Sequence, residues 1–303
     1  MERIVVSGAS GLVGPALVKK LDENYSVVLL RRKLSPNITA NTSREVLWNP
    51  PYTGDWIKRV DGAHAVINLS GEPIAGKRWS KAQKDVLRKS RLDTTRAIVE
   101  AITQAKVKPK VLINASAIGF YGPRDEARLD EASPSGSGFL SSVCREWEET
   151  ARRVETMGVR VVLLRTGIIL AKEGGALKKL LPPFRMGVGG PLGSGKQYFS
   201  WIHLDDEIGA VLKCLEDPNV KGPVNLTAPN PVTNAELSKT LGKLLKKPSS
   251  LPAPGFALKL ILGEMADMLL TGQNVHPKKL QDAGFTFKYD TLESALSDLL
   301  KGA

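Results

Sequence analysis

Three glycines near the N-terminus have the spacing of a phosphate-binding turn. Gly8, Gly11 and Gly14 follow an apolar run at 4–6, and a helical pattern begins directly after them. A strand, a tight turn and a helix N-terminus therefore come in the order that a dinucleotide site needs. Gly8 and Gly11 would let the backbone approach a pyrophosphate, and Gly14 would let the helix pack against the strand. The free N–H groups of the helix N-terminus would attract the phosphate charge.

A run of three cations ends the second predicted strand. The apolar run at 27–30 is followed by Arg31, Arg32 and Lys33. Dinucleotide sites usually carry an Asp or Glu there, which binds the adenosine ribose hydroxyls. A carboxylate would repel a 2′-phosphate, whereas arginines bind phosphate through charge-assisted and often bidentate hydrogen bonds. Without the glycine turn, a solvated strand end would be the simpler interpretation. With the turn, Arg31 and Arg32 predict NADP(H) as the cofactor, in preference to NAD(H).

The elements that must position these residues alternate along the chain. Further strands are expected at 45–48, 65–69, 111–116 and 160–164, with helices at 80–105 and 139–157. This alternation predicts an α/β fold of the Rossmann type, a doubly wound parallel sheet. Such sheets bind ligands beyond the carboxyl ends of their strands. Leu69, Ser70 and Gly71 end one of these strands, so we expect them at the edge that faces the cofactor.

Past residue 174 the alternation is less regular, which predicts a second, smaller lobe of mixed and mainly helical structure. A strand is expected at 224–226 and a short one at 285–289, with helices that begin at Thr233 and near Thr291. The predicted domains are a nucleotide-binding domain at 1–169, to which 200–220 returns, and a substrate lobe at 170–199 and 221–303, with 250–303 as a small C-terminal domain.

Charge and composition bear on the class of protein. The formal net charge of +12 comes from 43 Lys and Arg against 31 Asp and Glu, but these cations are scattered and no nucleic-acid-binding motif accompanies them. Two distant cysteines and three histidines support neither a metal site nor a disulfide framework. No apolar run is long enough for a membrane span, and the first strand begins too early for a targeting peptide. We therefore expect a cytoplasmic protein, or an organellar one if the chain is a mature form, with a small-molecule substrate, no nucleic acid, no membrane and a monomeric or homodimeric state.

Four motifs carry a resemblance to a known superfamily. They are the turn at 8–14, residues 67–71, Ser116 with Tyr121 and Gly122, and Asp130-Glu131 with Pro134. Together they resemble the short-chain dehydrogenase/reductase superfamily, in its extended, epimerase/dehydratase-like branch. Later stretches at 71–74, 77–80, 90–95, 144–148, 189–195 and 201–203 are similar to a subfamily with a small C-terminal domain of unknown function, often named nucleotide-diphosphate-sugar epimerases. The resemblance covers essentially the whole chain.

The resemblance also implies roles for individual residues along the cofactor. The pyrophosphate would be lined by Gly8, Ser10, Gly11, Leu12 and Val13, and the 2′-phosphate would be held by Arg31 and Arg32. Leu69 and Ser70 would pass the adenosine half, with Gly71 beside them at the cofactor-binding edge, and Arg91 would reach the cofactor from its helix. Ser116 would border the nicotinamide, and Ile168 and Ile169 would close over it.

One departure from the superfamily concerns the catalytic pair. Members that do redox chemistry use Tyr-x-x-x-Lys, in which the lysine lowers the pKa of the tyrosine so that it can exchange a proton beside the hydride. No tyrosine of this chain is followed by a lysine four residues later. The usual spacing puts the tyrosine near Ser142 and the lysine near Glu146. A serine without a base is too weak an acid, and a glutamate would raise the pKa of a neighbouring phenol.

Three interpretations therefore stay open. The first is an oxidoreductase or epimerase with relocated acid and base groups, for which Ser116, Tyr121 and Glu72 are the catalytic candidates. For Tyr121 the simpler interpretation is an aromatic wall of the substrate site, and Glu72 is equally a candidate for a structural cap or an ion-pair partner. The second is an NADP(H)-binding sensor that acts through a protein partner. The third, a nucleic-acid binder, has only the net charge and the basic helix in its favour. We favour the enzyme, because a glycine-rich loop and a C-terminal lobe form an elaborate pocket for a sensor.

Overall fold

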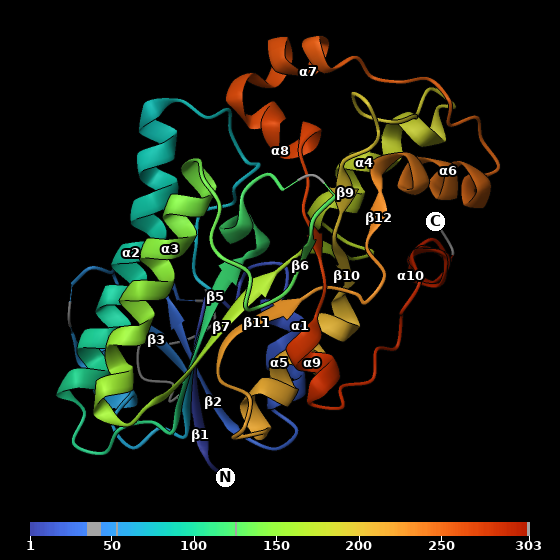
Figure 1. Cartoon of the computed structure of the whole chain (residues 1–303). Coiled ribbons are helices and arrows are strands. Elements are labelled where there is room, and N and C mark those ends of the chain that lie inside the picture. The colour runs from blue at the N-terminus through green and yellow to red at the C-terminus, as the bar shows by residue number, and fades with distance from the viewer. Residues whose placement is uncertain (35–43, 53, 125, 302–303) are drawn as a thin grey trace.

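A seven-stranded sheet lies at the centre of the molecule (Figure 1). The computed structural model describes residues 1–34, 44–52, 54–124 and 126–301. The strand order is β11-β7-β5-β4-β1-β2-β3, and every pair in this sheet is parallel. This confirms the doubly wound Rossmann-type sheet predicted from the sequence. The strands are β1 (Arg3–Ser7), β2 (Ser26–Arg31), β3 (Glu45–Leu47), β4 (Ala65–Asn68), β5 (Val111–Ala117), β7 (Arg160–Thr166) and β11 (Gly222–Leu226).

Both faces of the sheet are covered, and successive strand residues point to opposite faces. Ile4 and Val6 of β1 belong to the core under α1 and α5, whereas Val5 belongs to the core under α2 and α3. Continuous apolar runs in the strands follow from this double burial. The covering helices are α1 (Gly14–Leu21) and α5 (Leu204–Glu216) on one face, and α2 (Lys81–Gln104) and α3 (Phe139–Arg152) on the other.

Side-chain caps fix the start of several helices. Ser80 caps α2 by accepting a hydrogen bond from the backbone N–H of Gln83. Thr233 and Glu236 form a reciprocal capping box at the start of α6 (Asn234–Leu245). Thr291 caps the last helix, α10 (Leu292–Leu299). All three helix starts are confirmed where the sequence predicts them.

A second core lies outside the sheet. Trp201, Phe184 and Tyr289 are among its buried residues, which come from 170–201 and 228–299. The short elements around it are β8 (Ile168–Leu170), α4 (Gly175–Arg185), β9 (Tyr198–Phe199), β10 (Trp201–His203) and β12 (Val232–Thr233). The remaining elements are η1 (Asp55–Arg59), η2 (Ile118–Tyr121), β6 (Arg128–Leu129), η3 (Arg153–Met157), α7 (Gly255–Leu262), η4 (Gly263–Ala266), α8 (Asp267–Leu270), β13 (Asn274–Val275) and α9 (Lys278–Asp282).

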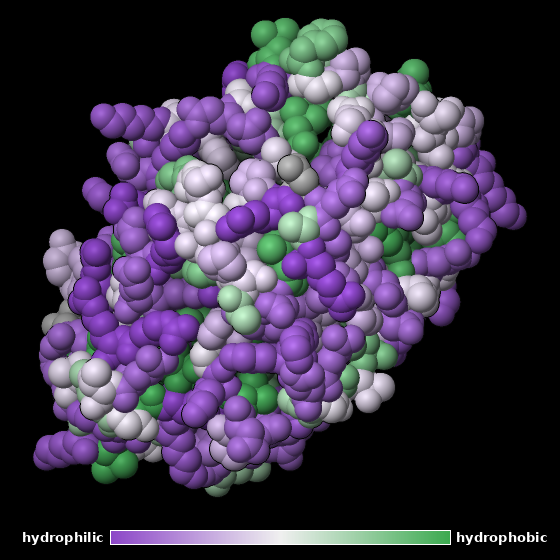
Figure 2. All heavy atoms as spheres, in the orientation of Figure 1, coloured by the Kyte–Doolittle hydropathy of each residue, from purple (hydrophilic) through white to green (hydrophobic). Residues whose placement is uncertain are grey.

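Helix α7 carries apolar side chains at the surface. Phe256, Leu260 and Ile261 are exposed, and hydrophobic residues gather over α7 at the top of Figure 2.

Within the part of the chain that the structure describes, no helix combines the length and apolarity that crossing a membrane would require.

Two sequence-based expectations for the C-terminal half differ from the structure. The strand predicted at 285–289 is wrong, since the segment is irregular. Apolar and polar residues alternate along this segment because Phe285 and Phe287 pack on the sheet core. The backbone N–H groups of Lys288 and Tyr289 are bound by the Asp206 carboxylate, at 2.7 and 3.0 Å, and not by a neighbouring strand. The strand expected at 224–226 is present as β11 and joins the main sheet beside β7, although the predicted domain boundary assigned those residues to the substrate lobe.

Candidate functional site

The glycine turn has the tight geometry that a phosphate-binding turn needs. Gly8 has a positive φ of 76°, and a Cβ added there would lie 2.5 Å from the carbonyl carbon of Leu69. A Cβ on Gly14 would lie 2.3 Å from the carbonyl oxygen of Ala9. Only glycine fits these two positions, as predicted for Gly14 from helix packing. Helix α1 begins after Val13 with no side-chain cap, so its first N–H groups are left for an anion.

A cavity of about 180 Å³ lies beside this turn, at the carboxyl ends of the central strands. It joins seven residues predicted from the sequence to contact the cofactor: Gly8, Gly11, Leu12, Val13, Leu69, Ser116 and Ile169. It also includes five residues that were not predicted to contact it: Gly14, Ala115, Leu164, Thr166 and Glu207. The glycine turn and Ser116 thus share one hollow, large enough for part of a dinucleotide. Ser10, Ser70, Gly71 and Ile168 lie within two positions of lining residues in the sequence but do not line the cavity themselves.

Arg31 and Arg32 lie at the carboxyl end of β2, on the same edge as the turn, because β2 runs parallel to β1 with Leu30 opposite Ser7. The Nε atom of Arg31 is 2.7 Å from Oε1 of the buried Glu45 on β3. This ion pair orients the Arg31 side chain, while Arg32 is exposed. Two arginines at this edge suit a phosphate, and Glu45 is a positioning partner of Arg31 that the sequence did not reveal.

Arg91 contacts the loop that follows β4. A Cβ on Gly71 would lie 3.3 Å from Cζ of Arg91, and Arg91 lies over the ring of Trp147 with its Cζ 5.2 Å from the ring centroid. Burial lowers the pKa of Arg91, and the negative charge of Glu72 acts in the opposite direction. Glu72 is half-buried, its backbone N–H donates to the Ser90 hydroxyl at 3.0 Å, and it does not line the cavity. The structure thus places Glu72 beside Arg91 and outside the cavity, and both roles considered for Glu72 stay predictions.

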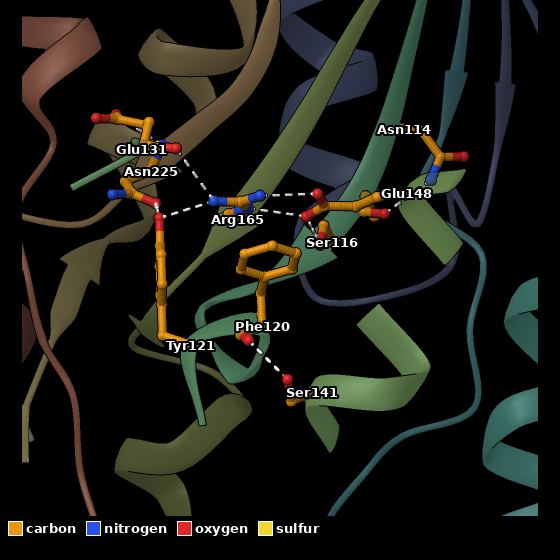
Figure 3. A network of polar contacts seen from close by, with 10 residues as sticks. Asn114, Ser116, Phe120, Tyr121, Glu131, Ser141, Glu148, Arg165 and Asn225 are labelled. Carbon is orange, nitrogen blue, oxygen red and sulfur yellow. Dashed lines mark hydrogen bonds and ion pairs between the residues drawn. The ribbon is translucent and has the colours of Figure 1, made fainter. Parts of the chain in front are cut away.

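Ser116 connects the cavity to a buried network of polar side chains (Figure 3). Its hydroxyl donates to Oε1 of Glu148 at 2.7 Å. Arg165 binds the same carboxylate through two hydrogen bonds, from Nε and Nη2, each of 2.9 Å. Glu148 and Arg165 are both about 95% buried or more, so the pair is shielded from water. The Ser116 hydroxyl is therefore held in a fixed direction at the cavity wall.

Comparison with known protein families agrees with this geometry. The model of the NAD dependent epimerase/dehydratase family matches residues 4–226, which include the glycine turn, the sheet and Ser116. The chain belongs to this family. A second model, for a domain of unknown function (DUF1731), matches residues 253–299.

Members of the family resemble the chain over nearly its full length. The Arabidopsis thaliana "Epimerase family protein SDR39U1 homolog, chloroplastic" is 41% identical over 98% of this chain and 86% of its own. The Mycobacterium bovis "Epimerase family protein Mb2239" is 41% identical over 97% of this chain and 96% of its own. The crystal structure of the human epimerase family protein SDR39U1 with NADPH superposes with a TM-score of 0.90, at 33% identity over 99% of this chain and 100% of that one.

Within this family fold, Tyr121 lies in the buried network and not at the cavity. Its hydroxyl donates to Oδ1 of Asn225 at 2.7 Å and accepts from Nη1 of Arg165 at 3.0 Å. Tyr121 is fully buried, and burial raises its pKa to about 12. Neither the catalytic role nor the substrate-wall role predicted for Tyr121 matches this position, because both require an exposed ring or hydroxyl.

The positions predicted for the catalytic pair make other contacts. The Ser142 hydroxyl donates to Glu146 at 3.5 Å, and Glu146 pairs with Arg88 on α2 at 2.5 Å. The carboxylate that reaches the site is that of Glu148, two residues further along α3. Spacing in the sequence could not separate Glu146 from Glu148, since this depends on which face of α3 meets β5.

Glu207 is the functional candidate that the sequence analysis missed. The residue is one of those that line the cavity, although it is only 2% exposed. The hydroxyl of Thr166 donates to Oε1 at 3.0 Å, and burial raises the pKa of Glu207 to about 8. A signal was present in the helical spacing, because Glu207, Val211 and Cys214 share one face of α5 and the latter two are apolar. An acidic residue in such a stripe is either paired or functional.

Proposed function

We propose that the chain binds NADP(H) across the glycine turn and acts as an epimerase-like oxidoreductase on a small-molecule substrate. The observation that carries the proposal is the single cavity that joins the uncapped N-terminus of α1 to Ser116. The 2′-phosphate would be held by Arg31 and Arg32 at the same edge. The crystal structure of the human relative is one with NADPH, which supports this choice of cofactor.

The bound cofactor would supply a hydride donor or acceptor, and the chain would orient the reacting groups. Ser116 is the cavity-lining hydroxyl that can donate to or accept from a substrate oxygen. Glu148 does not act on Ser116 as a free base, since Arg165 already neutralises the Glu148 carboxylate. We infer that Ser116 orients substrate and that the usual tyrosine is not required. The substrate would lie between this edge and the lobe formed by 170–199 and the residues after β11.

The alternative function is an NADP(H)-binding sensor that signals to a protein partner. The observation in its favour is the burial of Tyr121, which leaves no phenol among the described residues that line the cavity. A sensor needs tight and selective binding but no proton donor. The two functions therefore share the binding step and differ in turnover.

Calorimetric titration with NADPH and NADH tests the shared step. Loss of a charged hydrogen bond costs about 1.5–3 kcal/mol, so the loss of two in Arg31→Ala with Arg32→Ala should weaken NADPH binding by about 100-fold or more and leave NADH binding nearly unchanged. Lys19→Ala with Lys20→Ala removes the same charge from exposed positions of α1 and serves as the control. Equal weakening of both cofactors by the arginine variant would remove the assignment of the 2′-phosphate.

Turnover then separates the enzyme from the sensor. Oxidation of bound NADPH is followed by absorbance against a panel of carbonyl compounds and nucleotide sugars. An oxidoreductase consumes NADPH with at least one class of compound, whereas an epimerase leaves the cofactor unchanged overall and converts a nucleotide sugar into its epimer, which chromatography detects. Ser116→Ala should slow either reaction while leaving the dissociation constant for NADPH within a few-fold. Tight NADPH binding with neither consumption of NADPH nor formation of an epimer across the panel would favour the sensor.

A further inference from the structure

Only one of the two carboxyl oxygens of Glu207 has a hydrogen-bond partner among the described residues. Thr166 donates to Oε1 at 3.0 Å, but Oε2 has no hydrogen-bond partner among the described residues, although it is buried. A buried polar atom without a partner costs free energy and is rare in folded proteins. This atom belongs to a cavity-lining residue beside the glycine turn. Its missing partner is therefore expected in the cavity.

Glu207 lies in a cavity that is otherwise free of charge among the described residues. Of those that line it, Glu207 alone carries an acidic or basic side chain, so no lining cation compensates the carboxyl. Burial dominates its pKa, and the Thr166 hydroxyl is its hydrogen-bonding neighbour. An ionised Glu207 would place an unpaired negative charge in an apolar pocket. At neutral pH the group is therefore largely protonated and able to donate a hydrogen bond from Oε2.

The acidic and basic side chains that flank Glu207 in the fold, Asp205, Asp206, Glu148 and Arg165, have partners of their own. On α5, Asp205 pairs with Lys288, Asp206 accepts two backbone N–H groups, and Cys214 has its pKa raised to about 12 by burial. Across the cavity, β5 presents Ser116, behind which Glu148 and Arg165 neutralise each other. The glycine turn and the start of α1 present Gly8, Gly11, Leu12, Val13 and Gly14, none of which titrates.

We propose that protonated Glu207 donates a hydrogen bond from Oε2 to the bound dinucleotide, and that loss of this proton weakens cofactor binding as the pH rises. The inference rests on the proposed function, because it needs NADP(H) in this cavity. A proton on Glu207 supplies a donor to an anionic ligand, whereas a carboxylate would repel it. Glu207 would thus couple cofactor occupancy to pH near the physiological range.

The size of the effect follows from proton linkage. If NADPH binds only to the protonated form, affinity at pH 9 is about tenfold lower than at pH 7 for a group that titrates near pH 8. A phosphate monoester has its second pKa at about 6, so the 2′-phosphate of NADPH is fully charged across this interval. Arginine side chains do not titrate there either. The change in NADPH affinity between pH 7 and pH 9 would therefore reflect the titration of Glu207.

Calorimetric titration of the full chain with NADPH from pH 6.5 to 9 tests the inference, in buffers of different ionisation enthalpy. The wild type should lose about tenfold in affinity between pH 7 and pH 9 and take up a proton on binding near pH 8.5. Glu207→Gln, which keeps a neutral donor, should bind with a flat pH profile and without proton uptake. The control Glu216→Gln, at an exposed position of the same helix, should retain the wild-type profile.

A second variant moves the midpoint without removing the carboxyl. The Thr166 hydrogen bond lowers the pKa of Glu207, so Thr166→Val should shift the pH midpoint of binding upward. A flat wild-type profile, or a Glu207→Gln profile that still falls with pH, would overturn the role of Glu207 while leaving NADPH binding intact. Failure of the wild type to bind NADPH at any pH would instead refute the proposed function.

Discussion

Replacement of Glu207 by Gln should change how the stability of the protein depends on pH. In the native state, burial raises the pKa of this carboxyl from its ordinary value of 4.5 to about 8. A raised pKa means that the group contributes fully to stability below pH 4.5 and that this contribution is lost progressively as the pH rises through 8. Between those values, each pH unit costs the wild type about 1.4 kcal/mol, because the unfolded chain has lost the proton that the native protein keeps.

The side chain of the variant does not titrate, so the free energy of unfolding of the variant relative to that of the wild type should rise by about 2–3 kcal/mol between pH 5.5 and pH 7.5. Urea unfolding followed by tryptophan fluorescence at pH 5.5, 6.5, 7.5 and 9 measures this difference. Effects of the amide that are independent of pH, such as an imperfect hydrogen bond with Thr166, shift all four values equally. Burial also raises the pKa values of Glu131 and Asp206, but both residues are present in both proteins, so their contributions cancel in the difference between the two free energies of unfolding. A difference between the two proteins that stays constant across this range would refute the assignment of Glu207 as a buried, proton-retaining acid.

Two further substitutions test the turn and the network. Gly11→Val should abolish NADPH binding without unfolding the protein, since Gly11 is exposed and a Cβ there would meet only the Gly8 carbonyl oxygen at 3.4 Å. Circular dichroism checks that the variant is folded, and titration with NADPH checks that binding is lost. Normal binding would contradict the assignment of the phosphate-binding turn. Tyr121→Phe should destabilise the fold by about 1–3 kcal/mol, because Asn225 and Arg165 each lose a buried partner. NADPH binding by this variant should stay at the wild-type level. A selective loss of binding in a stable protein would show that Tyr121 takes part in cofactor binding.

The cofactor edge could be predicted from sequence because its signals are local. Gly8 and Gly14 are forced by contacts within the strand–turn–helix unit and with the neighbouring strand end, and the caps at Ser80 and Thr233 act over three residues. Alternating strands and helices then leave few ways to order a parallel sheet, which places Leu69 and Ser116 on the edge that faces the turn.

The residues that escaped prediction depend on contacts between distant elements. Glu148 reaches Ser116 only because α3 packs on β5 with that face inward, and Arg165 reaches Glu148 from β7. Tyr121 looked available because it follows a strand, but η2 turns it into the core beside Asn225. Packing of this kind is set by the tertiary fold, and neither spacing nor propensity specifies it.

Binding of NADP(H) at this edge of the sheet, with selection for the 2′-phosphate, underlies every role proposed for these residues. Two dissociation constants for the wild-type chain, one for NADPH and one for NADH, measured at pH 7 and equal ionic strength, test it without any substitution. We expect NADPH to bind at least about tenfold more tightly, in line with the energy of a charged hydrogen bond from Arg31 or Arg32. Equal constants, or a preference for NADH, would contradict this assignment.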